Sequence, residues 1–171
     1  MSPFGSVRSV CSAKAMAIAA QRWYENFRPS GVKVHAGAPV IEQGKVEQDF
    51  KDLAEAGVVL LGEVGLGTVK DGTTAQQMVG WARKYGIQST IHTGGPSIPG
   101  SGLIDADMVI ETGTDVIGHI NGGHSALPDD QIICLCERCS SAFEIVHNGN
   151  ERSAVLALNT ARELGKLDQI I

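Results

Sequence analysis

The stretch VVLLGEVGLGTVKDGTTAQQMVGWARKYGIQSTIH, residues 58–92, contains one complete strand–helix–strand unit. Its two ends predict β-strands over Val58–Glu63 and Ile87–His92, because short apolar and β-branched runs bounded by glycine are typical of buried strands. A helix between them is predicted from apolar residues at intervals of four and three: Met78, Ala82 and Tyr85. Strands joined in this way pair in parallel, since a parallel pair needs a crossover of about a dozen residues or more.

The same alternation continues along the chain. Further strands are predicted at Val32–His35, Val116–His119 and Phe143–His147, and a last one begins at Leu167–Ile171. Helical periodicity marks Ala13–Phe27, Val46–Leu53 and Ala154–Ala161. Four glycines are expected to end helices in the left-handed conformation, and Pro128 suits a first helical turn; the glycines are Gly57, Gly86, Gly113 and Gly165. Repeated units of this kind build either an open doubly wound sheet or a (β/α)8 barrel.

The residues at the strand ends favour the barrel. Five successive strands are closed, at nearly equal intervals along the chain, by His35, Glu63, His92, His119 and His147. In barrel enzymes the chemistry lies at the C-terminal ends of the strands, whereas a doubly wound sheet gives no reason for such a ring. The expected fold class is therefore α/β, an incomplete (β/α)8 TIM-type barrel.

Imidazole and carboxylate groups at neighbouring strand ends are ligands for zinc, iron or manganese. A single strand-end histidine is more often structural, but a series in one register favours a metal role for Glu63, His92 and His119. His35 and His147 are open between substrate contact and simple packing. His124 lies outside the register, in a loop.

Composition limits the possible partners. The 171 residues carry a net charge of -5 with 14 scattered Lys and Arg, which argues against a nucleic-acid partner. The longest apolar run is far shorter than a membrane span, so no membrane partner is expected. The four cysteines, one of which is Cys11, form no secreted disulfide pattern and favour a reducing cytoplasm. The cluster of Cys134, Cys136 and Cys139 is interpreted as buried apolar residues rather than a zinc site.

Glycines flank two of the strand ends, where a ligand's approach would be close to the backbone. Gly62, Gly65 and Gly67 surround Glu63, and a second set follows His92: Gly94, Gly95, Gly100 and Gly102. Neither set completes a dinucleotide fingerprint or a phosphate-binding P-loop, so both nucleotide interpretations are rejected.

Four segments together resemble the metal-dependent amidohydrolase superfamily and, within it, the enamidase group of nicotinate fermentation. They are GVKVHAG (31–37), GEVGLGTVKD (62–71), IHTGGPSIPGSG (91–102) and GHINGG (118–123). The resemblance implies one or two divalent metals, zinc or iron, with Glu63 as bridging carboxylate on strand four, His92 as the strand-five ligand and His119 as the strand-six ligand. It also implies that a metal-activated hydroxide hydrolyses the C–N bond of a cyclic amide such as 6-oxo-1,4,5,6-tetrahydronicotinate. Candidate substrate contacts are His35, Gly94, Gly95, Asn121 and His147.

The sequence departs from the superfamily pattern in one respect. The HxH pair of strand one does not occur anywhere in it. Residues 1–171 are therefore expected to form a partial barrel domain equivalent to about strands three to eight, lacking strands one and two, most of strand eight and the flanking β-domain. Little or no activity is expected from the chain alone, and open barrel edges predict self-association or a homo-oligomer.

Two other interpretations stay open. GEVGLG is similar to a segment of TatD-like metal-dependent phosphodiesterases, although the glycine-rich loop after His92, the GHINGG segment and the few basic residues favour the amidohydrolase. The chain could also be a truncated barrel without catalysis, acting as an interaction module. A measurement of bound metal separates this non-catalytic interpretation from the amidohydrolase and the phosphodiesterase.

Overall fold

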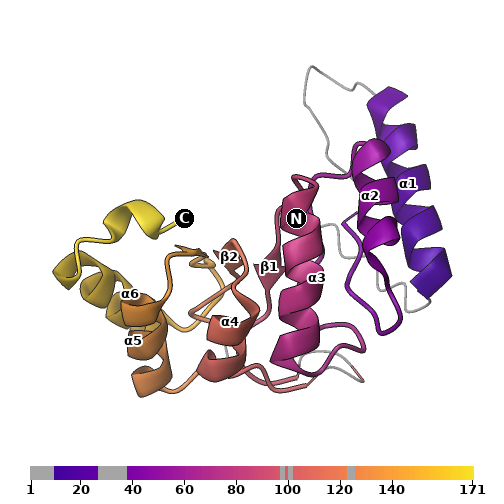
Figure 1. Cartoon of the computed structure of the whole chain (residues 1–171). Helices are drawn as coiled ribbons and strands as arrows, with labels where there is room; N and C mark the ends of the chain where they lie inside the picture. Colours follow the sequence, from indigo (N-terminus) through magenta and orange to yellow (C-terminus); the bar gives the residue numbers. More distant parts are fainter. Residues whose placement is uncertain (1–9, 27–37, 97–98, 100–101, 123–125) are drawn as a thin grey trace.

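The computed structural model describes residues 10–26, 38–96, 99, 102–122 and 126–171. Within these residues, six helices follow one another in chain order, from α1 on one side of the molecule to α6 on the other (Figure 1). They are α1 (Val10–Asn26), α2 (Glu47–Glu55), α3 (Gly72–Lys84), α4 (Ala106–Thr112), α5 (Asp129–Arg138) and α6 (Glu151–Glu163), with a short 3-10 helix η1 (Leu167–Gln169) near the C-terminus. Each helix packs on its neighbour in the sequence. No helix in these ranges is long and apolar enough to cross a membrane.

The strands form a small parallel sheet in the order β1 (Thr90–Ile91), β2 (Val116–Ile117) and β3 (Ala142–Phe143). Ile91 pairs with Ile117, and Ile117 pairs with Phe143. Single parallel bridges extend the sheet on both sides, from Gln88 and Ile91 to the 60–64 segment and from Phe143 to Ile170. The predicted succession of parallel strand and helix units is thus confirmed.

Short-range signals set the helix ends. The side chains of Asp71, Asp105 and Asn150 accept hydrogen bonds from backbone N–H groups three residues ahead, which begins α3, α4 and α6. The four predicted glycines all have a positive φ, between 63° and 83°: Gly57, Gly86, Gly113 and Gly165. Each lets the chain leave a helix and turn towards the next strand.

The core lies between the sheet and the helices. Ile91, Ile117 and Phe143, which pair across the three strands, are 0% exposed. From the helices, Phe50, Leu53 and Ile132 are equally buried, and the other large side chains of the core are mainly isoleucines and leucines. Burying this apolar surface is the main stabilising contribution to the fold, and it fixes the strand ends from which the candidate site projects.

Several predicted elements differ from the structure in extent. The segment Val58–Glu63 makes only single bridges at Leu60 and, just beyond it, Val64. The strand predicted over Phe143–His147 ends at Phe143, although backbone hydrogen bonds to neighbouring segments continue at Glu144 and Ile145. At Val146 the Asn121 side chain binds both backbone groups instead, Nδ2 donating to its O (2.9 Å) and Oδ1 accepting from its N (2.8 Å).

Two further predictions need correction, and one cannot be compared. The chain forms η1 over Leu167–Gln169 where a strand was predicted to begin, and only Ile170 pairs in the sheet. Pro128 is the N-cap of α5 rather than a residue of its first turn. The strand predicted at Val32–His35 lies outside the described residues.

Candidate metal centre

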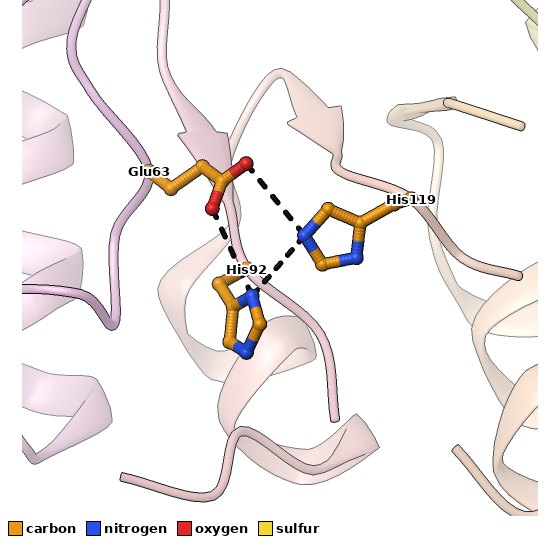
Figure 2. A group of neighbouring side chains, drawn as sticks. All are labelled: Glu63, His92 and His119. Atoms are coloured by element: carbon orange, nitrogen blue, oxygen red, sulfur yellow. Dashed lines mark hydrogen bonds and ion pairs between the residues drawn. The ribbon is translucent and has the colours of Figure 1, made fainter. Parts of the chain in front are cut away.

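Glu63, His92 and His119 come from three neighbouring strand ends and point towards one another (Figure 2). His92 Nδ1 lies 3.1 Å from His119 Nε2. The two oxygens of Glu63 lie 3.7 Å from His92 Nδ1 and 3.6 Å from His119 Nε2. The structure therefore brings together the three residues that the sequence singled out as metal ligands.

The hydrogen bond of His92 to the backbone fixes its tautomer. His92 Nε2 lies 2.8 Å from the carbonyl oxygen of Gly95, and a carbonyl can only accept, so Nε2 carries the proton. In the neutral ring, Nδ1 is then unprotonated and directs its lone pair at Glu63 and His119. Metal-binding histidines are oriented by the same kind of hydrogen bond from their second nitrogen.

Burial and charge act differently on the two imidazoles. Burial lowers the pKa of His92 below 6.5, which keeps this ring neutral at pH 7. Burial also opposes the charged form of His119, but the hydrogen bond and the negative charge of Glu63 outweigh it and raise the pKa of this ring. Glu63 thus favours a positive charge at His119 Nε2, whether it is carried by a proton or by a cation.

The donor set fits a divalent cation. Ligands about 2.0–2.1 Å from a tetrahedral zinc ion lie about 3.3–3.4 Å from one another. The donor separations here, 3.1, 3.6 and 3.7 Å, are close to that spacing. The side chains of His92, Glu63 and His119 are only 3%, 13% and 19% exposed, so water solvates their charges and lone pairs poorly.

The loop after β1 packs beside this centre. Gly94 and Ile104 exchange two backbone hydrogen bonds of 2.9 Å each, which returns the loop after β1 to the strand end. The Ile104 side chain lies against Gly65, where an added Cβ would come within 2.7 Å of it and 3.7 Å of the His92 Cβ. An apolar side chain therefore packs close to the strand end that carries His92.

A buried carboxylate ties the loop after Glu63 to the preceding loop. Glu42 is 1% exposed, and its Oε2 accepts from the backbone N of Thr68 (3.1 Å) and from its hydroxyl (2.5 Å). The Thr68 hydroxyl in turn accepts from the backbone N of Gln43 (2.8 Å). Sequence reasoning missed Glu42, and no pattern in the chain distinguishes it from a surface glutamate.

The proposed substrate contacts occupy different environments. Gly94 and Gly95 lie beside His92, whereas Asn121 is buried and its side-chain amide forms hydrogen bonds with the backbone of Val146. His147 is exposed in the turn after β3. Their roles towards a substrate stay predictions. His35 and His124 lie outside the described residues.

The cysteine cluster lies away from this centre, in and just after α5. Cys136 is buried within the helix, and Cys139 is the buried residue that ends it. Burial raises the pKa of the Cys136 thiol to about 11 and also raises that of Cys139. Both thiols are therefore poor thiolate ligands at neutral pH.

A second carboxylate that the sequence did not single out lies at the end of β3. Glu144 Oε2 accepts a hydrogen bond from the backbone N of His119 at 2.9 Å. The near-equal spacing of the strand-end residues in the sequence pointed to His147 instead. The observed register pairs Ile117 with Phe143, so the residue that follows the paired position on β3 is Glu144.

Known proteins resemble this chain over nearly its whole length. No family model matches the chain. The enamidase of Eubacterium barkeri is 43% identical over 167 residues, which is 98% of this chain and 43% of the enamidase. A solved structure of enamidase, described as a member of the amidohydrolase superfamily, superposes with a TM-score of 0.89 over 96% of this chain and 43% of that one.

These matches do not favour the phosphodiesterase alternative. The chain spans less than half the length of the enamidase that it matches. The resemblance inferred from the sequence is confirmed: over nearly its whole length, this chain is similar in sequence and structure to part of an enamidase of the amidohydrolase superfamily.

Proposed function

We propose that this chain forms part of the catalytic barrel of a metal-dependent amidohydrolase that opens a cyclic amide, such as 6-oxo-1,4,5,6-tetrahydronicotinate. The observation that supports this most strongly is the convergence of Glu63, His92 and His119 in a chain 43% identical to an enamidase. The proposed substrate is a small molecule, and zinc or iron is the proposed metal.

The strand assignments belong to the same proposal. Glu63 would follow strand four of the barrel, His92 strand five and His119 strand six, so that residues 1–171 correspond to about strands three to eight. The HxH pair of the superfamily is not in the sequence. The remaining ligands would therefore come from outside residues 1–171, and we expect the chain alone to bind metal with little or no turnover.

The residues present would hold one or two divalent cations through the Glu63 carboxylate, His92 Nδ1 and His119 Nε2. Such a cation supplies Lewis acidity that polarises an amide carbonyl and lowers the pKa of water towards neutrality. The chain's own groups prepare the site for this chemistry. The Gly95 carbonyl holds the proton on His92 Nε2, which leaves Nδ1 free as a donor atom.

Other groups shape the pocket. Ile104 packs against Gly65 beside His92. Such an apolar neighbour would exclude water and so strengthen the electrostatic interactions within the site. Gly94 and Gly95 carry no side chains, so a planar amide could approach the backbone beside His92. Exposed sheet edges would favour self-association of the isolated chain, and a homo-oligomer is part of the proposal.

A chimera tests this function. In the enamidase of Eubacterium barkeri, the segment matching this chain is replaced by residues 1–171, and release of ammonium from 6-oxo-1,4,5,6-tetrahydronicotinate is measured. The chimera should be active with zinc or iron. Glu63→Gln should lower the rate by more than the roughly 10–100-fold that loss of an outer partner costs.

The matched control is Glu163→Gln, which changes an exposed carboxylate at the end of α6 and should leave the rate unchanged. A folded chimera that binds metal but releases no ammonium would contradict the proposed reaction. A Glu63→Gln chimera that releases ammonium as fast as the unaltered chimera would contradict the proposed role of Glu63.

A further inference from the structure

His119 has an unusual backbone conformation. Its φ is +35°, and among the described residues it is the only one other than glycine with a positive φ. Non-glycine residues rarely adopt this region, and they keep it only where the surrounding structure holds them there. The conformation of His119 therefore needs a cause in its surroundings.

The strand register explains why the conformation is needed. Ile91 and Ile117 pair, so the next residue of each strand brings His92 level with Gly118, and His119 is one residue further on. In an extended strand, successive side chains point to opposite faces. An extended His119 would therefore point away from His92, whereas the observed turn brings the two ring centres to 4.8 Å.

The side chain of Glu144 contacts this turn directly. Phe143 pairs with Ile117, which places Glu144 level with Gly118 on the neighbouring strand. Its Oε2 accepts from the backbone N of His119 at 2.9 Å. Hydrogen bonds to a carboxylate are stronger than those between neutral groups.

Other contacts close around the same turn. Glu144 also accepts from the backbone N of Ile120 through its own carbonyl, at 2.9 Å. The Thr93 hydroxyl donates to the carbonyls of Gly118 (3.1 Å) and His119 (3.3 Å). The His119 carbonyl also accepts from the backbone N of Gly122, at 2.6 Å. Both peptide groups of His119 are thus bound, and the charged partner among these described residues is Glu144.

We propose that Glu144 is a positioning residue, which holds His119 in the left-handed conformation that aims its imidazole at Glu63 and His92. Its hydrogen bond runs to the backbone of His119, so it acts through that residue. The inference rests on the proposed function only in taking His119 as a metal ligand. The placement of the His119 ring by Glu144 is a separate claim and can fail separately.

The test uses the whole chain with Glu144→Ala, Glu144→Gln and the control Glu163→Ala. Two quantities are measured: hydrogen exchange of the His119 amide without metal, and Co²⁺ affinity with its visible absorption spectrum. Glu144→Ala should speed the exchange at least tenfold, weaken Co²⁺ binding by about 10–100-fold and alter the spectrum. Glu144→Gln should recover most of both, because its amide oxygen can still accept from the His119 N–H.

Unchanged exchange in a folded Glu144→Ala chain would overturn the proposal, whatever happens to the metal. If Glu144→Ala does not fold, a Glu144→Gln chain with neither slow exchange nor the native Co²⁺ spectrum would overturn it. An equal loss in Glu163→Ala would also overturn it, because the effect would then be general destabilisation. Failure of the unaltered chain to bind Co²⁺ would contradict the proposed function, while the exchange of the His119 amide would still decide the role of Glu144.

Discussion

Replacing Gly118 by alanine should destabilise the sheet that carries the candidate site. A Cβ at this position would lie 2.8 Å from the carbonyl oxygen of Ile91 and 3.2 Å from the Thr90 hydroxyl, where ordinary contact begins at 3.4 Å. The Ile91 oxygen is backbone and already accepts from Gly118 N at 2.9 Å. This oxygen cannot move away from the added Cβ without weakening the pairing of β1 with β2.

The expected cost follows from this overlap. Overpacking in a well-packed interior costs about 1–3 kcal/mol. With a urea dependence of about 1–3 kcal/mol per M, the unfolding midpoint should fall by about 1 M. Urea unfolding followed by circular dichroism measures it.

Gly80 provides a control of opposite sign. It is an exposed residue within α3, and an added Cβ there meets nothing within 4 Å. Gly80→Ala should therefore stabilise the chain by about 0.5–1 kcal/mol. A Gly118→Ala chain as stable as the unaltered one, with Gly80→Ala behaving as expected, would refute the close approach of β1 and β2 at Gly118.

Three further predictions concern the supports of the fold. Burial opposes the charged form of Asp115, but hydrogen bonds from Ser89 and the Arg83 guanidinium outweigh it and hold the pKa of this carboxyl below its ordinary value. The stability that the carboxylate adds is therefore present at neutral pH and is lost as pH falls. Asp115→Asn should lower the free energy of unfolding by about 1–3 kcal/mol at pH 7. In urea unfolding at several pH values, the difference in stability between the two chains should become smaller below about pH 4; a difference that stays constant would contradict this role of the Asp115 carboxylate. Cys136, whose burial raises its pKa to about 11, should be alkylated by iodoacetamide far more slowly in the native chain than in urea; equal rates by mass spectrometry would show that the thiol is accessible. Lys166→Met removes an ammonium that donates to three carbonyls at the end of α5. It should lower the free energy of unfolding by about 1–2 kcal/mol and the melting temperature by several degrees; an unchanged melting temperature would show that these hydrogen bonds do not stabilise the fold.

Much of the fold could be predicted because its signals are local. Glycines after four of the helices, and apolar runs between helices, identified the alternation of elements, and the structure has positive φ at Gly57, Gly86, Gly113 and Gly165. Strand lengths could not be predicted in this way. β3 ends at Phe143, and a few residues later the Asn121 side chain binds the backbone of Val146, a tertiary contact that no local pattern encodes.

The candidate site was predictable for a different reason. Parallel strands bring their C-terminal ends to one edge, so Glu63, His92 and His119 could be placed together from the chain order alone. The role of His147 was inferred from a spacing that assumed equal strand phases. The observed register places Glu144 rather than His147 directly after the paired residues of β3, while the role of His147 towards a substrate stays a prediction. The left-handed turn at His119 brings its ring to the side of the sheet on which His92 lies. Register depends on packing across strands, which sequence spacing does not determine.

Zinc titration of the metal-free chain tests the central claim most directly. Isothermal calorimetry on the unaltered chain, His92→Ala, His119→Ala and the exposed control His147→Ala should give about one zinc ion bound by the unaltered chain and by His147→Ala. The variants His92→Ala and His119→Ala should lose this binding. Equal zinc binding by all four chains, or none by the unaltered chain, would contradict a metal centre formed by Glu63, His92 and His119.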